Sequence, residues 1–160
     1  MKISEAILDD AESIARIQAV VHNMHVGNIA WYFKKVDDHR FVEAMRKVIQ
    51  RTETYAIVAK IDEEIVGYAV CFIRDVPESA FIKENRYLYL EQIGVHPLFR
   101  RRGIGRELIK AILEYARQKS LGRVVLDTWE FNEEALRFFQ SMGFEIQMSR
   151  LAMAIDKNSE

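Results

Sequence analysis

The sequence predicts a mixed α/β fold in which helices cover both faces of one sheet. Segments with the apolar spacing of a helix alternate along the chain with short runs rich in β-branched and aromatic residues. One such run, residues 87–95, is largely apolar at both odd and even positions, which is typical of a central strand covered on both sides. The 160 residues, 49% apolar and 29% charged, suit a globular protein with one buried core. We therefore expect a single domain over residues 1–155 and a short tail over residues 156–160.

The first third of the chain predicts one strand and two helices. Residues 2–6 can form a short strand, and Asp9 or Asp10 can cap the helix that follows. Residues 22–35 show no clean period and are expected to form a loop. A second helix is expected over residues 37–50. The residues expected to face the core from the two helices are Ile14, Ile17, Val21, Phe41, Met45 and Val48.

The middle of the chain predicts a hairpin followed by the central strand. Two runs rich in β-branched and aromatic residues, 55–61 and 65–73, flank a turn of acidic residues. The polar residues 74–86 include a proline and are expected to form a loop. The central strand 87–95 is expected to end before Pro97, because the residue before a proline is held in an extended conformation.

The last third predicts two helices and three strands. In chain order these are a helix from Gly103 to about Ser120, a strand over 124–128, a helix over 132–142, and strands over 144–148 and 150–155. The first of these helices is expected to bury Ile104, Leu108, Ile112 and Tyr115. Gly122 and Gly143 are placed to end the two helices.

Charge and cysteine content exclude several classes of protein. A formal net charge of -1 argues against broad adhesion to nucleic acid or membranes. The N-terminus lacks the apolar stretch of a secretory signal, and no segment approaches the ~18 apolar residues of a membrane span. We expect a cytoplasmic protein in which Cys71, the single cysteine, is a buried, reduced thiol. His22 and His25 have no third ligand beside them, so no metal site is expected.

A dense positive spot interrupts this neutral sequence. Arg100, Arg101 and Arg102 run into a glycine-spaced turn, Gly103-Ile104-Gly105, at the start of a helix. Backbone N–H groups can converge in such a turn, and the helix N-terminus adds partial positive charge. The segment therefore suits a phosphate or pyrophosphate, with Arg106 as a further cation. A tight turn that carries a solvated charge run is the structural alternative. The Rossmann and Walker patterns are excluded, because the third glycine and the Gly-Lys-Ser/Thr triplet are missing.

Two spaced patterns make a family resemblance specific. Arg100-x-x-Gly103-x-Gly105 resembles the cofactor-binding motif of the GNAT superfamily of N-acetyltransferases. A later pattern of the same superfamily resembles Asn132-x-x-Ala135-x-x-Phe138-Phe139-x-x-x-Gly143-Phe144. The specific match covers residues 87–144, and the first third matches only in the order of its elements.

The resemblance implies a fold and a cosubstrate. The sheet would be mostly antiparallel, with helices on both faces and one splayed pair of parallel strands, 87–95 and 124–128. Acetyl-coenzyme A would lie in that gap, with its pyrophosphate on residues 101–106. The backbone of Ile93, Gly94 and Val95 would pair with the pantetheine arm, and Asn132, Phe138 and Phe139 would line its other side. A homodimer through the terminal strands would follow by analogy with relatives.

The implied reaction transfers an acetyl group to a primary amine, on a small molecule or on a protein or peptide, by direct attack on the thioester. Glu91 is the candidate base, because it is the only acid on the strand that would hold the cosubstrate. Tyr89 and Ile93 are expected to flank it on one face and to raise its pKa by partial desolvation. The alternative is a structural carboxylate. The oxyanion would be stabilised by a backbone N–H near residues 93–95.

One position departs from the family pattern. Phe139 stands where many members carry a tyrosine that protonates the departing thiolate, and phenylalanine cannot donate a proton. The thiolate could leave unaided, Tyr89 or Tyr115 could reach in, or the protein could be a catalytically weak acyl-coenzyme A-binding sensor. A nucleic-acid-binding module is disfavoured by the neutral charge.

The candidates for the acceptor site are aromatic and acidic residues. Trp31, Tyr32 and Phe33 are candidates for its wall, although a core role fits them equally well. Asp127 and Glu130 could attract a cationic amine, but ordinary surface chemistry is the favoured interpretation for both.

Overall fold

The computed structural model describes residues 1–155, and the expected tail over residues 156–160 lies outside the described residues. The chain forms two compact units, one over Met1–Asp127 and one that begins at Thr128.

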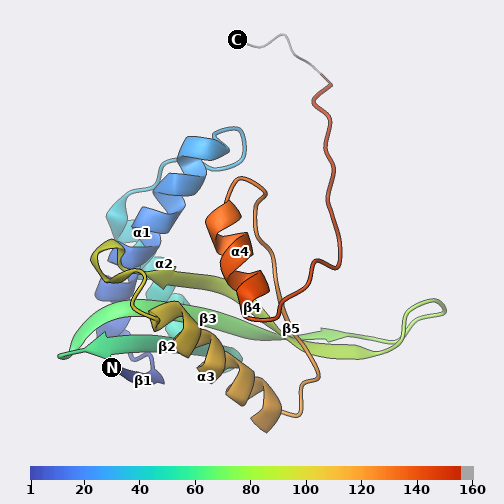
Figure 1. Ribbon diagram of the computed structural model, residues 1–160, viewed down its shortest axis with the longest axis horizontal. Coiled ribbons are helices and arrows are strands. Elements are labelled where there is room, and N and C mark those ends of the chain that lie inside the picture. The colour runs from blue at the N-terminus through green and yellow to red at the C-terminus, as the bar shows by residue number, and fades with distance from the viewer. Residues whose placement is uncertain (156–160) are drawn as a thin grey trace. The chain divides into compact units, whose positions relative to one another are not determined.

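The first unit is built on a five-stranded sheet with the order β1-β2-β3-β4-β5 (Figure 1). Its strands are β1 (Lys2–Glu5), β2 (Thr54–Ile61), β3 (Glu64–Val76), β4 (Asn85–Val95) and β5 (Val124–Leu126). Neighbouring strands are antiparallel except for β4 and β5, which are parallel. The expected mixed, mostly antiparallel sheet is thus confirmed, and β4 is an interior strand with a neighbour on each side.

Helices cover both faces of this sheet. On one face, α1 (Ala11–Asn28) and α2 (Asp38–Ile49) bury Ile14, Ile17 and Met45 in a cluster with β2 and β3. On the other face, α3 (Ile104–Gln118) packs so closely that a Cβ on Gly67 of β3 would lie 2.9 Å from Cγ2 of Ile104. We call these the α1 face and the α3 face.

The first helix is longer than the sequence indicates. It runs to Asn28, so the expected loop over residues 22–35 is wrong in its first half. His25 lies within the last turn, where its Nδ1 bonds the carbonyl of Val21 at 2.8 Å, and Asn28 bonds the carbonyl of Met24 at 2.8 Å. The mixed polar and apolar pattern over residues 22–28 therefore does not end the helix, because hydrogen bonds from His25 and Asn28 to the backbone support the final turns of α1.

The β3–β4 hairpin is also longer than expected. The two strands include residues 74–76 and 85–86, so the loop predicted over 74–86 shrinks to residues 77–84. Asp75 and Arg86 are register partners whose Oδ1 and Nε lie 2.9 Å apart. Figure 1 shows this ribbon projecting past the other strands. Both faces of this part of the hairpin are exposed to solvent, so its strands carry charged residues. For this reason the segment has the sequence pattern of a loop.

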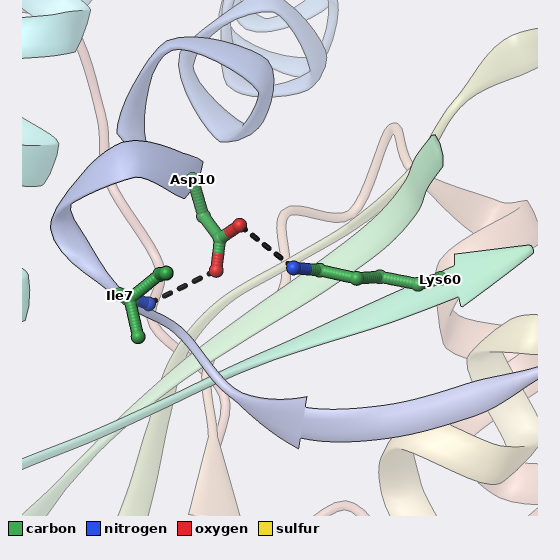
Figure 2. A network of polar contacts seen from close by, with 3 residues as sticks. All are labelled: Ile7, Asp10 and Lys60. Carbon is green, nitrogen blue, oxygen red and sulfur yellow. Dashed lines mark hydrogen bonds and ion pairs between the residues drawn. The ribbon is translucent and has the colours of Figure 1, made fainter. Parts of the chain in front are cut away.

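Asp10 anchors the start of α1 to the sheet instead of capping the helix. Its side chain is 92% buried and accepts a hydrogen bond from the N–H of Ile7 at 2.9 Å (Figure 2). The ammonium of Lys60 on β2 donates to its other oxygen at 2.9 Å. Both oxygens of this buried carboxylate thus have a partner, and the two bonds fix the β1–α1 connection.

Helices α3 and α4 (Glu133–Ser141, in the second unit) end with the same backbone motif. In α4, Gly143 has φ 93°, and the N–H of Phe144 bonds the carbonyl of Phe139 at 3.1 Å. In α3 the left-handed residue is Ser120 (φ 55°), and the N–H of Leu121 bonds the carbonyl of Ala116 at 2.9 Å. These are Schellman ends. Gly143 has the expected role, whereas Gly122 does not.

The two strands expected near the C-terminus are not found. In residues 1–155 no strand follows β5, so the predictions over 144–148 and 150–155 are wrong, and β5 itself is shorter than predicted. A strand requires a hydrogen-bonded neighbour, and alternating apolar residues alone do not supply one. Side chains over residues 145–155 are exposed, Leu151 by 93%.

No helix among the described residues combines the length and apolar character needed to cross a membrane.

Candidate functional site

Strand β4 carries a β-bulge at Glu91. Leu90 pairs with Cys71 and Gln92 pairs with Val70, so Glu91 has no residue opposite it on β3. A bulge shifts the alternation of side chains by one residue. Tyr89, which pairs with Phe72, consequently lies on the α1 face, whereas Ile93 lies on the α3 face. The expectation that Tyr89 and Ile93 flank Glu91 on one face is therefore wrong.

Glu91 itself is exposed, which differs from the partial desolvation expected from sequence. Bulges occur often beside active sites, where they re-aim a side chain. The bulge thus presents a carboxylate to solvent in the middle of β4. Its role as a base remains a prediction.

Strand β4 continues past the end of its pairing with β5. The last pair is Leu90 with Leu126, while β4 runs on to Val95. Ile93, Gly94 and Val95, the residues expected to bind the pantetheine arm, therefore lie where no described residue of β5 pairs with them. A Cβ on Gly94 would lie 2.7 Å from the Tyr68 ring, so packing on the α1 face requires glycine there.

A tight junction connects β4 to α3. After a single 3-10 turn (Pro97–Phe99), the Nε of Arg100 donates to the carbonyl of Val95 at 3.4 Å. The guanidinium of Arg102 lies 5.1 Å from the ring centroid of Phe99. Two of the three successive arginines thus contact the junction itself and brace it.

The backbone of this junction has the form of an anion-binding nest. The φ angle is positive at Arg101 (63°) and Gly103 (82°) but not at Arg102 between them. Alternation of this kind turns successive N–H groups toward one point. The next N–H groups belong to the first turn of α3, Ile104 to Arg106, and have no carbonyl partner within the helix.

Space and charge at the junction also suit an anion. Nothing lies within 4 Å of the position that a Cβ on Gly103 would occupy. Arg101, Arg102 and Arg106 are exposed around it, while Ile104 is buried and holds the first turn of α3 on the sheet. The positive end of the helix, the nest and these cations together favour a phosphate or pyrophosphate.

Both tyrosines considered as proton donors have other partners. The hydroxyl of Tyr89 donates to Oδ2 of Asp127 at 2.9 Å. Burial, and then this bond, raise the pKa of Tyr89 to about 12, which makes it a weak acid. Tyr115 stacks on Tyr55 of β2 with ring centroids 3.7 Å apart, and burial raises its pKa. Since β2 is separated from β4 by β3, Tyr115 lies away from the free edge of β4.

In the second unit, the motif residues build the two ends of α4. Asn132 caps the helix, with its Oδ1 accepting the N–H of Ala135 at 3.2 Å. Phe139 contacts Phe138 and Phe144, with ring centroids 5.3 and 5.7 Å apart. The cap and the Schellman end of α4 therefore explain the residue types at three motif positions without any ligand: Asn132, Gly143 and Phe144. The expected contacts of Asn132, Phe138 and Phe139 with the cosubstrate remain predictions.

Trp31, Tyr32 and Phe33, the residues considered for an acceptor wall, lie just after α1, and His22 of α1 contacts Phe33. His22 bonds the carbonyl of Lys34 at 2.8 Å, and its ring packs against Phe33 and Phe41. Trp31 and Tyr32 are 79% and 64% exposed, so neither is a core residue. Among the described residues, no group of three or more His, Cys, Asp or Glu is placed to hold a metal ion.

Two features of the first unit were not apparent from sequence. The bulge at Glu91 depends on the register with β3, and no local pattern announces it. The Tyr89–Asp127 bond joins residues 38 positions apart.

Two small cavities lie away from the β4–α3 junction. One, of about 150 Å³, is at the C-terminal end of α3, and the other, of about 230 Å³, is beside Tyr55 and Tyr115.

Comparison with known proteins gives consistent findings. The model of the acetyltransferase (GNAT) family matches residues 18–144. An uncharacterized N-acetyltransferase of Archaeoglobus fulgidus is 28% identical over 143 residues, 88% of this chain and 90% of that protein. One from Methanocaldococcus jannaschii is 30% identical over 117 residues, 72% of this chain and 49% of that protein. Thialysine N-epsilon-acetyltransferase of Caenorhabditis elegans is 28% identical over 102 residues, 64% of this chain and 61% of that protein. The chain thus spans only part of the length of the last two.

Solved structures show the same fold. A Bacillus halodurans protein, solved as a tetramutant, superposes with a TM-score of 0.89 at 26% identity, over 97% of this chain and 100% of that chain. An aminoglycoside N-acetyltransferase in complex with coenzyme A superposes with a TM-score of 0.74 at 20% identity, over 98% of this chain and 94% of that chain.

Proposed function

This chain belongs to the acetyltransferase (GNAT) family, and from that premise we propose that it transfers the acetyl group of acetyl-coenzyme A to a primary amine. The acceptor would be a small molecule or a protein or peptide. The observation that carries the proposal is the junction between β4 and α3. At this junction the backbone φ angle alternates in sign, α3 begins, and exposed arginines lie around the turn. The junction directly follows β4, which extends beyond its pairing with β5.

The cosubstrate would extend along this strand and junction. Its pyrophosphate would accept N–H bonds from residues 101–106, with charge from the exposed arginines. Its pantetheine arm would pair with the backbone of Ile93, Gly94 and Val95, as an added strand pairs with a free sheet edge. The family resemblance assigns further contacts with the arm to Asn132, Phe138 and Phe139.

The proposed reaction requires only one side chain that accepts a proton. Glu91 would take a proton from the acceptor ammonium, directly or through water, and the neutral amine would attack the thioester carbon. A backbone N–H near residues 93–95 would stabilise the oxyanion. The intermediate then collapses: the C–S bond breaks, the thiolate leaves with the electron pair, and the second proton of the former ammonium passes to the thiolate or to water. A thiol with a pKa near ~8.5 is a good leaving group, so the phenylalanine at position 139 is tolerated.

Two measurements test the proposal. Isothermal titration calorimetry with coenzyme A should show binding of one molecule per chain. Thiol release from acetyl-coenzyme A should then accelerate with at least one member of an amine panel that includes diamines, aminoglycosides and peptide N-termini. Absence of coenzyme A binding would contradict both the proposed cosubstrate and the proposed acetyl transfer.

The alternative is a catalytically weak acyl-coenzyme A-binding sensor. Phe139 favours it, because phenylalanine cannot donate a proton to the departing thiolate. Binding of coenzyme A without any amine-dependent thiol release would select the sensor over the enzyme.

Further parts of the proposal concern the whole chain. We propose that residues 1–155 act as one domain in the cytoplasm, need no metal, and bind neither nucleic acid nor membrane, since the net charge is -1. A homodimer is proposed through the C-terminal segment, where Leu151 and Met153 are exposed by 93% and 88%. Light scattering of the full chain and of a chain ending at residue 144 tests the dimer.

A further inference from the structure

The Tyr89–Asp127 hydrogen bond lies where β4 and β5 stop pairing. Tyr89 pairs with Val125, and Asp127 is two residues farther along, so it shares a face with Val125 and is the diagonal neighbour of Tyr89. The last backbone pair is Leu90 with Leu126. The hydroxyl of Tyr89 therefore crosses from β4 to the residue that immediately follows the last pair, at 2.9 Å.

The ring of Tyr89 is itself held from the other side. The guanidinium of Arg74 on β3 lies 5.4 Å from its centroid and 5.8 Å from that of Phe72. A cation over an aromatic ring restrains the ring as well as attracting it. Tyr89 thus connects β3 through Arg74, β4 through its own backbone, and the residue directly after β5 through Asp127.

Strand β5 depends on such a connection because it is short. It comprises only Val124–Leu126, and its register with β4 has three pairs. A parallel ladder of this length is weak and frays from its ends. Fraying would move the point of separation back toward Leu88 and Val124. A side-chain bond just past the last pair opposes that movement.

We infer that Tyr89 and Asp127 are positioning residues that fix the point where β4 and β5 separate, and so set the mouth of the gap for the acetyl-coenzyme A arm. The inference rests on the proposed function for the gap's occupant. The separation then falls beside the Glu91 bulge, which would align the thioester, the oxyanion donors and the proposed base.

The alternative is that Asp127 acts through its charge on a cationic acceptor. Substitution by asparagine separates the two roles. Asp127→Asn keeps an oxygen that accepts from the Tyr89 hydroxyl but removes the charge, whereas Asp127→Ala removes both. The matched control is Tyr87→Phe, which deletes a hydroxyl from the same strand that makes no described hydrogen bond.

The test combines hydrogen exchange with binding. In Tyr89→Phe and Asp127→Ala, exchange of the amides over residues 124–128 should accelerate, and the coenzyme A Kd should rise about three- to tenfold, the range of one hydrogen bond. The double variant should be no worse than either single variant. Asp127→Asn and Tyr87→Phe should behave as wild type.

Three results would overturn the inference. Exchange in Tyr89→Phe could match that in Tyr87→Phe. The two single effects could add in the double variant. Exchange could stay unchanged in Asp127→Ala while Asp127→Asn and Asp127→Ala raise the KM for the amine equally, which would assign Asp127 a charge role. If wild-type protein binds no coenzyme A, the proposed function fails, but the exchange measurement still decides whether the bond holds the strands together.

Discussion

Gly103 is the single residue on which the proposed phosphate site depends most directly. Its φ of 82° strains any other residue, and a side chain there would project into the open space before the first turn of α3. In Gly103→Glu a carboxylate would occupy that space and repel a pyrophosphate. We expect calorimetry to show coenzyme A affinity reduced by at least about 100-fold, equal to ~3 kcal/mol.

Gly122→Glu is the matched control for this change. Gly122 also has open space around it, but its φ is not positive and it lies at the far end of α3. Its variant should bind coenzyme A as wild type does. Unchanged affinity in a folded Gly103→Glu protein would contradict the phosphate site.

Glu91 tests the proposed chemistry at the scale of one side chain. Glu91→Gln keeps the shape of the side chain and removes the proton acceptor, so kcat should fall by about 100-fold or more. Because Glu91 is exposed and unpaired across the sheet, the unfolding midpoint and the coenzyme A affinity should stay near wild type. An exposed acid at the start of β3, changed as Glu64→Gln, serves as control. A variant with an unaltered rate and pH profile would exclude Glu91 as the base.

At the scale of elements, the seat of α3 on the sheet positions the candidate site. A Cβ on Gly67 would lie 2.9 Å from Cγ2 of Ile104 and 3.1 Å from the carbonyl of Gly94. Gly67→Ala must therefore lift the first turn of α3, at a cost of about 1–3 kcal/mol in the free energy of unfolding. We expect urea unfolding to show this loss, together with weaker coenzyme A binding.

Gly27→Ala provides the comparison for Gly67→Ala. Gly27 lies within α1, and nothing is found within 4 Å of its Cβ position. Alanine there should stabilise the chain by about 0.5–1 kcal/mol through helix propensity. Equal stability in the two variants would mean that α3 is not seated through Gly67.

The elements also show what a sequence can and cannot predict. Helix α2, the β2–β3 hairpin and the start of α3 follow from local pattern, because periodicity and turn residues act over a few positions. The bulge at Glu91 and the end of the β4–β5 pairing depend on register between distant segments. For this reason the sequence predicts correctly that a helix begins at the Gly103 motif, but it does not predict which face of the sheet carries Ile93.

At the scale of the whole molecule, the buried protonated groups predict how stability depends on pH. Burial raises the pKa of the Cys71 thiol to about 12, and burial also raises the pKa of Tyr68. In the unfolded chain the thiol ionises near its ordinary value of 9.0. Between these two values the unfolded state binds fewer protons than the folded state. The free energy of unfolding therefore falls as pH rises through this window and is unaffected by the thiol below it.

Cys71→Ala isolates the contribution of the thiol. From pH 8 to 10.5, wild-type protein should lose about 2 kcal/mol more stability than the variant, since one pKa unit corresponds to ~1.4 kcal/mol. Urea unfolding under reducing conditions, followed by circular dichroism at both pH values, measures the difference. Tyrosines and lysines titrate in both proteins and cancel in the comparison. Parallel loss of stability in the two proteins would show that the thiol gains access to solvent in the folded state, contrary to the complete burial of Cys71 between β2 and β4.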